Sequence, residues 1–488
     1  MHNEKIVLSN SVGKDDSGLY IIHSPSRWSE GVRLLSSWFA YYPWELAYAS
    51  SLLKQKTNNT VKLIDPCLNR WDKHQTLAKI LAEEPDWLVI ESSTRTIKEN
   101  LWVVKNLKKT LPVKVIFTGQ HGSVFPQELI AEGIDYVCRG EYEITLLKFF
   151  QNKDKNYILG LYPNPRRQLL DVSYLPWPED TDVKRIDYAM PGEPSSEYTE
   201  IQAYASRGCR GNCNFCVARN IYYNEGIWRA RNISDIVNEI KYLKDKYPQM
   251  EGVFFDEETH NGDKSFIKEL TSALKSSGLA NLKYEAMCDM RLLDEEVLEN
   301  MKSAGYYKIR FGIETVSGSL SEKTGKPVKP EKVVDLLKQA KNIGLKSYVT
   351  FMFGLLGANI EEEQATINFM ERLIKDGLVT NVQISTATPF PGTPFYEEVK
   401  EKGYLIDNEP RCFDGANSVV VDYPQYRKKQ IEEIKKTALT KRDHLFFKKN
   451  IKENPFRFLY LRYKRYGFKL FMEKILRRIK TEIDYFNI

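Results

Sequence analysis

The chain has 488 residues, with 71 Lys and Arg against 65 Asp and Glu, which gives a formal net charge of +6. At about 150 residues a domain, this length predicts two or three domains that each bury a full core. No apolar run reaches about 18 residues, which excludes a typical transmembrane helix. The first residues, MHNEKIVLSN, lack the apolar core of a signal peptide, so we expect a cytoplasmic protein whose seven cysteines are ligands or core residues.

Alternating strand and helix patterns occupy residues 45–150. The strand-like segments VKLID, WLVIES, VKVIFTG and IDYVCRG are separated by helix-like segments, a pattern that predicts βαβ units and a parallel sheet. Several strands are apolar throughout, as expected when helices cover both faces of the sheet. The usual dinucleotide-binding fingerprint, GxGxxG, is missing. We therefore predict a doubly wound, Rossmann-like domain over residues 1–160, followed by a proline-rich linker over 161–195.

A second α/β run follows the linker. It contains six strand candidates that alternate with helices: 201–206, 252–256, 283–287, 308–312, 348–353 and 382–387. This alternation predicts a partial (β/α)6 barrel over residues 196–410, with ligands at the carboxyl ends of the strands. The remaining segment, 411–488, is predicted to be a basic and mostly helical C-terminal domain.

Three cysteines directly follow the first strand of the predicted barrel. Cys209, Cys213 and Cys216 are spaced C-x3-C-x2-C, so their thiolates can converge on one metal centre. A structural zinc site needs four ligands, and the nearest other cysteines, Cys138 and Cys288, lie about 70 residues away. We therefore predict a 4Fe–4S cluster with one iron left open. The alternatives are a zinc site completed by a distant His or Cys, and three cysteines without a shared role.

The cysteine loop and four later segments resemble the radical SAM superfamily, whose signature is C-x3-C-x2-C. The later segments are FFDEETHN, MRLLDEEVLENMKSAGYYKIRFGIET, FGLLGANIEEE and TPFPGTPFYE, of which the third departs from the family's GLPGET-x-E. The resemblance implies that Glu314 binds the ribose of S-adenosylmethionine (SAM) and that Gly312 lets the backbone approach this cofactor. It makes Asp256, Glu257 and Glu258 candidates for the methionyl ammonium group. The alternative for each carboxylate taken alone is a solvated charge at a strand end.

The N-terminal domain resembles the cobalamin-binding domain that precedes many radical SAM cores. The resemblance rests on YPWELAYASSLLK, VKLIDP, PDWLVIES, VIFTGQHGSVFP and GIDYVCRGEYEITL. It implies that cobalamin lies over loops that contain Ser92, Thr94, Gly119, His121, Gly140 and Glu141. The D-x-H-x-x-G motif, whose histidine ligates cobalt, is absent. His121 is a candidate ligand, with an ordinary polar loop residue as the alternative, and a scaffold that has lost cobalamin is the alternative for the whole domain.

The resemblance implies a radical SAM enzyme with a 4Fe–4S cluster, SAM and cobalamin as cofactors, and with flavodoxin or ferredoxin as electron donor. In this family the cluster and SAM supply a radical that takes hydrogen from an unactivated carbon. We therefore predict a cobalamin-dependent C-methyltransferase, with no catalytic residue assigned. A radical SAM cyclase or rearrangement enzyme, with or without cobalamin, is the alternative among enzymes, and a metal-stabilised anion-binding protein is the non-enzyme alternative. A methylthiotransferase is set aside, because it would need three further cluster cysteines upstream.

The basic charge is concentrated at the end of the chain. Residues 441–488 hold 14 Lys and Arg and 5 Asp and Glu, a net charge of +9, which leaves −3 for the rest. Aromatic residues are interspersed with these cations from Phe446 to Phe471. We expect either a helical cap packed on the barrel, or peripheral contact with an anionic membrane surface or lipid-linked substrate. An anionic soluble or peptide substrate is a further alternative, and nucleic acid is not expected.

Overall fold

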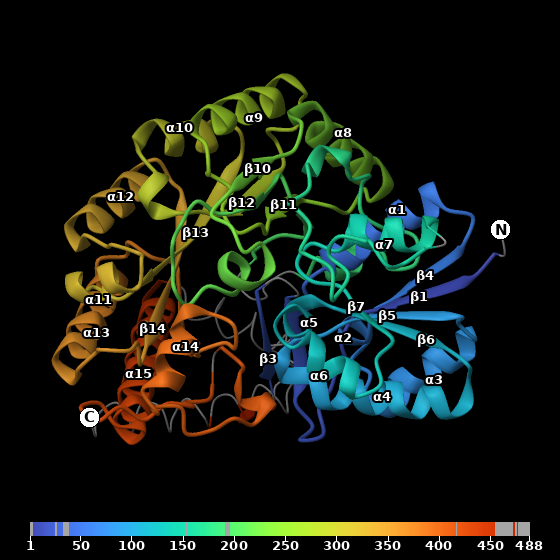
Figure 1. Ribbon diagram of the computed structural model, residues 1–488. Helices are drawn as coiled ribbons and strands as arrows, with labels where there is room; N and C mark the ends of the chain where they lie inside the picture. The colour runs from blue at the N-terminus through green and yellow to red at the C-terminus, as the bar shows by residue number, and fades with distance from the viewer. Residues whose placement is uncertain are drawn as a thin grey trace.

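A five-stranded parallel sheet forms the centre of the N-terminal part of the chain (Figure 1). The computed structural model describes residues 3–24, 27–32, 39–152, 154–190, 196–415, 417–453, 472–473 and 476. The strand order is β4-β1-β5-β6-β7, with β1 (Lys5–Ser9), β4 (Thr60–Ile64), β5 (Trp87–Glu91), β6 (Lys114–Thr118) and β7 (Tyr136–Val137). Four of these strands are predicted from the sequence. The fifth, β1, lies before residues 45–150, where the alternating pattern occurs.

Helices cover both faces of this sheet, which confirms the predicted doubly wound arrangement. On one face, α1 (Trp44–Lys56) and α7 (Glu143–Gln151) pack against Ile6 and Leu8. On the other face, Val7 packs with residues of three helices: α3 (Lys73–Glu83), α4 (Ile97–Thr110) and α6 (Pro126–Ala131). Adjacent residues of β1 are thus buried on opposite sides, which explains its apolar sequence. Two shorter helices, α2 (Pro66–Asn69) and α5 (Gly119–Val124), lie in the loops after β4 and β6.

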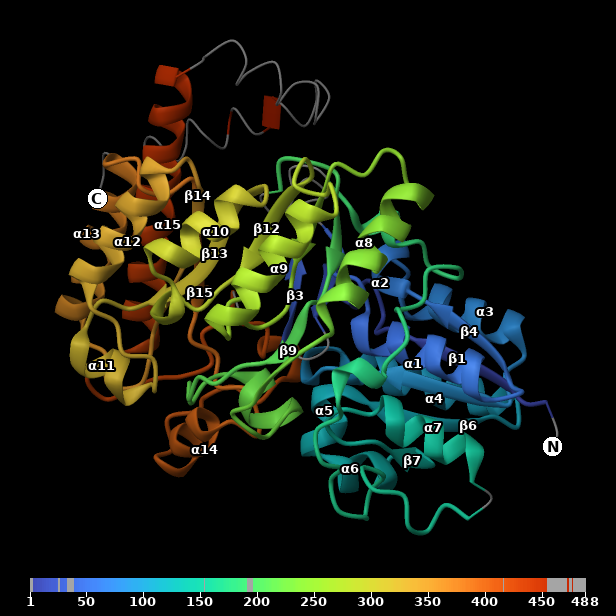
Figure 2. The same ribbon diagram turned by 90° about the horizontal axis from the view of Figure 1, so that it is seen from above.

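A six-stranded parallel sheet forms the second part of the fold. Its order is β15-β14-β13-β12-β11-β8, and all six predicted strands are present: β8 (Glu200–Ala203), β11 (Gly252–Phe255), β12 (Lys283–Met287), β13 (Tyr306–Glu314), β14 (Lys346–Phe353) and β15 (Asn381–Thr386). The helices lie outside this curved sheet (Figure 2). They are α8 (Ile233–Lys246), α9 (Lys264–Ser276), α10 (Glu295–Ser303), α11 (Gly318–Lys323), α12 (Pro330–Asn342) and α13 (Ile360–Lys375). Helix α14 (Pro394–Glu401) instead packs with Val217 and Ile221, beside the cysteine loop.

The outward-facing residues of these strands build the largest apolar core with the helices, as Ile309 and Phe311 of β13 do. Polar caps start the helices: the side chain of Asn359 accepts a hydrogen bond from the backbone of Glu362 at the start of α13. Asp263 caps α9 in the same way. Apolar strand residues therefore form the outer face of the barrel sheet, and polar cap residues define where its helices begin.

Two hairpins are not predicted. One, β2 (Tyr20–Ser24) and β3 (Trp28–Val32), lies between β1 and α1, and Figure 2 shows β3 between the barrel and the N-terminal sheet. The other pairs β9 (Ser206–Gly208) with β10 (Trp228–Ala230) around the cysteine loop. Both hairpins lie where the two parts of the chain meet.

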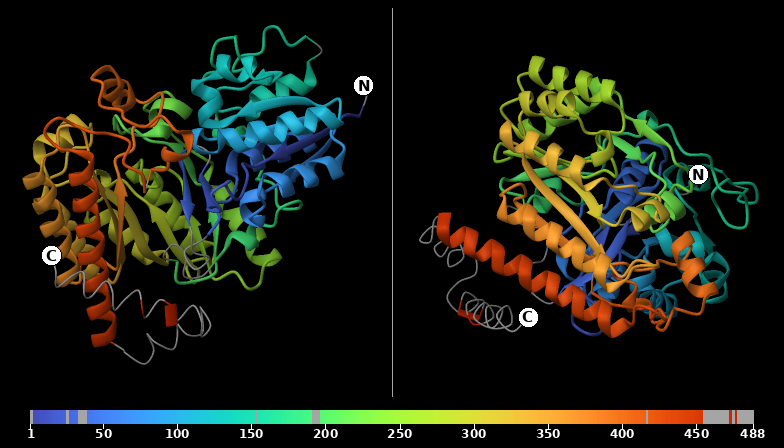
Figure 3. Two further views of the ribbon diagram at one scale, coloured as in Figure 1. Left: turned by 90° about the horizontal axis from the view of Figure 1, so that it is seen from below. Right: turned by 90° about the vertical axis from the view of Figure 1, so that its left-hand side faces the viewer.

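The segment between the two sheets and the C-terminal segment differ in regularity. The described residues 161–190 hold two 3-10 turns, η3 (Val172–Tyr174) and η4 (Arg185–Tyr188), and an isolated β-bridge at Leu161. At the other end, α15 (Lys428–Glu453) packs against α13 and β15 (Figure 3). The aromatic residues predicted between 454 and 471 lie outside the described residues. In the described part, no helix has the length and apolarity to cross a membrane.

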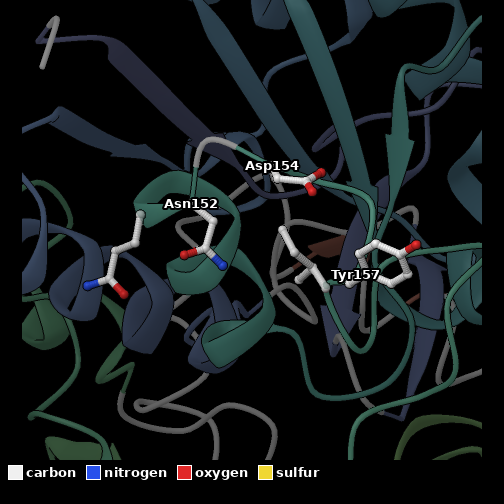
Figure 4. A pocket seen from close by; sticks show the side chains of 5 residues that line it. Asn152, Asp154 and Tyr157 are labelled. Carbon is white, nitrogen blue, oxygen red and sulfur yellow. The ribbon is translucent and has the colours of Figure 1, made fainter.

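A pocket lies at the end of α7, where Figure 4 labels Asn152, Asp154 and Tyr157. It is lined by Gln151, Asn152, Asp154, Tyr157 and Ile158. The side chain of Gln151 donates to the backbone oxygen of Lys56, at the end of α1 and just before the amino end of β4. Ligands of parallel α/β sheets bind at the carboxyl ends of strands, so this pocket is not a candidate for the active site.

Candidate active site

The carboxyl edges of the two sheets meet at one interface. Helix α5, which follows β6, packs against η5 (Ala218–Tyr222), a π-helical turn that follows the cysteine loop. A Cβ atom built on Gly140, after β7, would lie 2.9 Å from the backbone oxygen of Tyr222. Gly140 also has a φ of +68°, so both its backbone and its surroundings require glycine. The residues predicted to bind different cofactors are thus brought together.

The cysteine loop is held by hydrogen bonds to η5, which follows it, and to Thr324 at the end of α11. The side chain of Asn220, in η5, donates to the backbone oxygens of Cys213 and Cys216 at 2.9 and 2.7 Å. The backbone N–H of Asn214 donates to the backbone oxygen of Thr324. All three predicted ligands, Cys209 included, are partly accessible free thiols. The loop is therefore ordered, and none of its three thiols is bound in a disulfide.

Two cations lie beside the cysteine thiols. Burial raises the pKa of Cys213, whereas the charges of Lys326 and Arg291 lower it. Burial raises the pKa of Cys216 to about 12. Among the described residues, no group of three or more His, Cys, Asp or Glu side chains is close enough to hold one metal ion. The thiols of a 4Fe–4S cube bind separate irons and need not converge on one ion, so the loop fits a cube.

Glu314 and Gly312 lie together at the carboxyl end of β13, where the pairing with β14 is irregular. Glu314 has a φ of +66°, and its carboxylate pairs with Lys326 at 2.7 Å and accepts from Thr350 at 3.2 Å. A Cβ on Gly312 would lie 1.9 Å from the Glu314 carboxylate and 2.4 Å from Lys326 Nζ. Since Lys326 also neighbours Cys213, the predicted ribose-binding carboxylate is adjacent to the predicted cluster.

The three acidic residues after β11 point in different directions. Asp256 is 1% exposed and pairs with Arg27, at 2.7 Å. Glu258 accepts hydrogen bonds from the backbone N–H of Gly208, next to Cys209, and from another side chain, at 3.1 Å each. Glu257 contacts Nδ1 of His260 at 2.6 Å, and Nε2 of His260 contacts the hydroxyl of Tyr306 at 2.7 Å. Tyr306 belongs to the core between sheet and helices, so Glu257 is turned away from the cysteine loop.

The residues predicted to contact cobalamin lie in the loops after β5, β6 and β7. Ser92 accepts from Asn100 at 2.9 Å, and the hydroxyl of Thr94 lies 3.2 Å from Nδ1 of His121. Gly119 has a φ of +87°, and a Cβ there would lie 2.8 Å from the backbone oxygen of Ser92. These residues form one continuous edge of the sheet.

Glu141 differs from the other predicted cobalamin contacts, because its carboxylate already pairs with the second part of the chain. It accepts from Arg229 at 2.8 and 2.9 Å and from the backbone of Leu170 at 2.9 Å. Arg207 lies 2.7 Å from the carboxylate of the neighbouring Glu143. Buried ion pairs therefore connect the start of α7 to β9 and β10. Arg207 of β9 lies two residues before Cys209, the first of the three predicted cluster ligands.

Several buried polar atoms in and near the loops after β5 and β6 have no hydrogen-bond partner in the described part of the chain. Among the described residues, Nε2 of His121, Nε2 of Gln120, Nε and Nη1 of Arg95 and Nε2 of His23 are buried without a hydrogen-bond partner. Burial lowers the pKa of His121 to about 4, so its ring is neutral at pH 7. Buried polar groups without partners are rare in folded proteins. A corrinoid with many peripheral amides offers both donors and acceptors, so this edge fits the group.

Three functional side chains are not found from the sequence. Lys326 lies between Glu314 and Cys213, Arg27 pairs with Asp256, and Arg207 with Glu143. The contact of Arg27 spans 229 positions and starts from a hairpin that has no predicted strand. Lys326 follows Gly325, and a Cβ atom built on Gly325 would lie 2.0 Å from the backbone oxygen of Asn212. This close contact with the cysteine loop requires glycine, but the sequence alone does not show that the two segments meet.

Two family models match the chain. The radical SAM superfamily model matches residues 204–370, and the B12 binding domain model matches residues 32–149. An uncharacterised methyltransferase of Pyrococcus horikoshii is 28% identical over 395 residues, covering 78% of this chain and 83% of that protein. Cytidylyl-2-hydroxyethylphosphonate methyltransferase of Streptomyces wedmorensis is 29% identical over 433 residues, covering 75% and 79%.

A solved structure shares the fold of nearly the whole chain. The radical SAM methyltransferase TsrM from Kitasatospora setae, with cobalamin and a [4Fe-4S] cluster bound, has a TM-score of 0.64. Its sequence is 16% identical, and the match covers 91% of this chain and 89% of that one. The sheet order and the two-part architecture described above are therefore those of a known fold.

Proposed function

Because the chain belongs to the radical SAM enzymes that carry a B12-binding domain, we propose that it is a methyltransferase that acts on an unactivated carbon. Its cofactors are a 4Fe–4S cluster, SAM and cobalamin. The observation that carries the proposal is the packing of η5, directly after the cysteine loop, against α5 and Gly140 of the N-terminal domain. This contact brings the cysteine loop to the edge whose unpaired polar atoms support a corrinoid site there.

Each cofactor has a set of side chains that would hold it. Cys209, Cys213 and Cys216 would hold the cluster, and Glu314, with Lys326 beside it, would hold the SAM ribose. When bound, the cluster and SAM supply a carbon-centred radical, and cobalamin supplies the methyl group. The protein's part is to orient these groups and to exclude water from a buried interface.

We assign different roles to the three carboxylates that follow β11. Glu258 is tied to the backbone of Gly208, beside the cluster loop, and Asp256 keeps one oxygen, Oδ1, buried without a partner among the described residues. Both can accept hydrogen bonds from a cationic amine, which is the role we assign them toward SAM. Glu257 is bound to His260 in the core and would act by orienting this loop. A substrate and an external one-electron donor such as flavodoxin or ferredoxin complete the proposal.

Anaerobic reconstitution of the full-length protein tests the proposed function. The protein is incubated with reductant, cobalamin, methyl-labelled SAM and an extract of the host. We expect visible iron–sulfur absorption, formation of 5′-deoxyadenosine, and a product that carries the label on carbon. Cys213→Ser should abolish all three, whereas Cys412→Ser, a matched change of a partly exposed cysteine outside the loop, should abolish none.

The outcomes separate the alternatives. Formation of 5′-deoxyadenosine without transfer of the label would replace methylation by cyclisation or rearrangement. A colourless protein that cannot cleave SAM would contradict the radical SAM chemistry itself.

A further inference from the structure

The inner face of the six-stranded sheet is polar. Strand residues alternate between two faces, and Ile309 and Phe311 of β13 face the helices. Lys308 and Arg310 alternate with them and therefore face inward, as do Gln202 of β8 and Glu285 of β12. On the far side, the hydroxyl of Tyr348 donates to the side chain of Gln383 at 2.7 Å. Such a lining suits a polar molecule at the carboxyl end and is costly around an apolar one.

The charged groups of this inner face carry a positive surplus. Glu285 pairs with both Lys308 and Arg310. Burial, and then the charge of Glu285, raise the pKa of the neighbouring Glu200 to about 9, so this carboxyl is protonated at pH 7. Two basic side chains, Lys308 and Arg310, therefore pair with one ionised carboxylate, and burial lowers the pKa of Lys308. The guanidinium of Arg310 stacks on the ring of Phe254, 4.3 Å from its centre, and Phe254 lies two residues before Asp256. The positive charge of Arg310 therefore lies close to the carboxyl end of β11, which we call the mouth of the barrel.

A further cation reaches this mouth from the N-terminal domain. Arg27, in the β2–β3 hairpin, donates from Nη2 to Asp256 at 2.7 Å and from Nε to Ser24 at 3.0 Å. Its guanidinium lies 5.2 Å from the ring centre of Tyr41. The same segment contacts β8, because the backbone N–H of Tyr42 donates to Gln202 at 2.9 Å. Since Asp256 directly follows β11, this ion pair places the guanidinium of Arg27 at the carboxyl end of that strand.

In the absence of ligands, the positive charge of Arg27 is balanced by the negative charge of Asp256. Asp256 is one of the carboxylates that we assign to the SAM ammonium group, and its Oδ1 is already free to accept. Once Asp256 interacts with that cation, Arg27 has to share or lose its counter-ion. The side chain of Arg27 is 14% exposed, and a largely buried unpaired cation is strongly unfavourable. SAM brings one carboxylate but also a sulfonium with this ammonium group, so it adds a net positive charge, and an anion that enters with the substrate restores the balance.

We propose that Arg27 recognises an anionic group of the substrate, a carboxylate or a phosphate, so that the substrate is a polar anionic small molecule rather than an apolar lipid. The inference rests on the proposed function for the identity of the second ligand. It also implies that SAM and the substrate anion bind cooperatively, because each takes one partner of the same ion pair.

Binding of SAM to the reconstituted full-length protein tests this coupling without turnover. The dissociation constant is measured by equilibrium dialysis in chloride, and again with acetate or inorganic phosphate added at matched ionic strength. We expect one of the two anions to tighten SAM binding about fivefold in the wild type. Arg27→Gln should abolish the effect and Arg27→Lys should retain part of it. Arg372→Gln, on the outer surface of α13, is the matched control and should retain it fully.

An equal SAM affinity with and without both anions in the wild type would overturn the proposal. So would an anion effect that survives in Arg27→Gln, provided that its unfolding temperature matches that of the wild type. The charge of the methyl-labelled product gives a second measurement: retention on an anion exchanger supports the proposal, and partition into an apolar solvent contradicts it. If no labelled product forms, the proposed function fails, while the anion dependence of SAM binding still decides the role of Arg27.

Discussion

Glu314 shows how much a single residue of the site depends on its backbone. Its left-handed φ of +66° is unfavourable for a residue with a side chain, and such strain persists where the surroundings fix it. Here the irregular pairing of β13 with β14 turns the carboxylate over Gly312, toward Lys326. The strain therefore places a charged acceptor beside the cluster loop, where an ordinary strand residue would point elsewhere.

We expect Glu314→Gln to weaken SAM binding about tenfold, because a hydrogen bond to a charged acceptor is replaced by one to a neutral amide. Equilibrium dialysis of the reconstituted protein measures the affinity. Glu322→Gln, at an exposed position of α11, is the control and should leave it unchanged. The visible spectrum is recorded in parallel, since Lys326 also neighbours Cys213. Unchanged SAM affinity in Glu314→Gln at full cluster content would contradict the ribose-binding role.

Glu45 gives the protein a defined dependence of stability on pH. This first-turn residue of α1 is fully buried, and both of its carboxylate oxygens lack a partner among the described residues. Burial, only partly offset by the charge of Arg207, raises its pKa from 4.5 to about 7. A raised carboxyl pKa means that the folded state binds the proton more tightly. The stabilisation is therefore complete below pH 4.5 and is lost as the pH rises toward 7.

Glu45→Gln should remove this loss. Over the 2.5 pH units between the two pKa values, the wild type should lose about 3 kcal/mol relative to the variant. Urea unfolding of the cofactor-free protein at pH 5 and pH 8 measures the difference. Glu45→Gln should be the more stable protein at pH 8, with a smaller gap at pH 5. A gap that widens toward low pH would show that Glu45 is ionised in the folded protein.

The sequence predicts the site residues that belong to short motifs and misses those that depend on distant contacts. The cysteine spacing and the segment around Glu314 are local patterns, and the structure places them side by side. Arg27 and Lys326 are set by contacts that no local pattern encodes. For the three carboxylates after β11, the sequence predicts a shared role, but the chain leaves the strand there and turns Glu257 toward His260.

At the scale of elements, the contact between β9 and α7 connects the two parts of the chain. Arg207 is 2% exposed and pairs with Glu143, which is fully buried. Its guanidinium also lies 4.9 Å from the ring of Tyr48. Removal of one partner of a buried ion pair leaves the other charge uncompensated, at a cost of about 3–5 kcal/mol. This contact should therefore hold β9, and with it the cysteine loop, in place.

Arg207→Met should lower the free energy of unfolding by about 3 kcal/mol. It should also reduce the amount of cluster retained after reconstitution. Arg372→Met, an exposed arginine on the outer surface of α13, is the control and should change neither quantity. Urea unfolding and iron content measure the two effects. Equal stability of Arg207→Met and wild type would show that the interface does not depend on this pair.

Elements with periodic apolar residues are predicted well, and the hairpins are not. All six barrel strands and four of the five N-terminal strands are predicted, because their buried faces impose a pattern. The β2–β3 hairpin contains Arg27 and Glu30 and contacts the short helix α2 and the 3-10 turn Thr94–Thr96, not a layer of long helices, so it has no such pattern. Yet this hairpin supplies the charge at the barrel mouth, and the residues hardest to predict are thus the ones that connect the two domains.

The arrangement of the whole molecule follows from one property of parallel sheets. Each sheet gathers its functional loops at its carboxyl edge, and the chain turns these two edges toward each other. The cysteine loop and η5 come from one edge, and α5 and Gly140 come from the other. Under the proposed function, the cysteines that would hold the cluster lie next to the N-terminal domain that would hold cobalamin. Neither sheet alone contains a complete site.

The C-terminal segment divides into a packed part and a charged remainder. Helix α15 continues to Glu453, His444 within it is fully buried, and Lys441 pairs with Glu371 of α13 at 3.4 Å. This part is a cap on the barrel. A chain that ends at Lys441 should therefore unfold at a lower temperature than one that ends at Glu453, which should match the full length.

The remaining residues, 454–488, hold nine Lys and Arg and three Asp and Glu, a net charge of +6. If they bind an anionic membrane surface, the full-length protein should float with vesicles that contain phosphatidylserine, whereas the chain that ends at Glu453 should stay at the bottom of the gradient. Added salt should release the full-length protein, because screening weakens attraction between exposed charges. Neutral phosphatidylcholine vesicles are the control. Equal flotation of the two chains would reject membrane contact through these residues and leave the cap as the role of the segment.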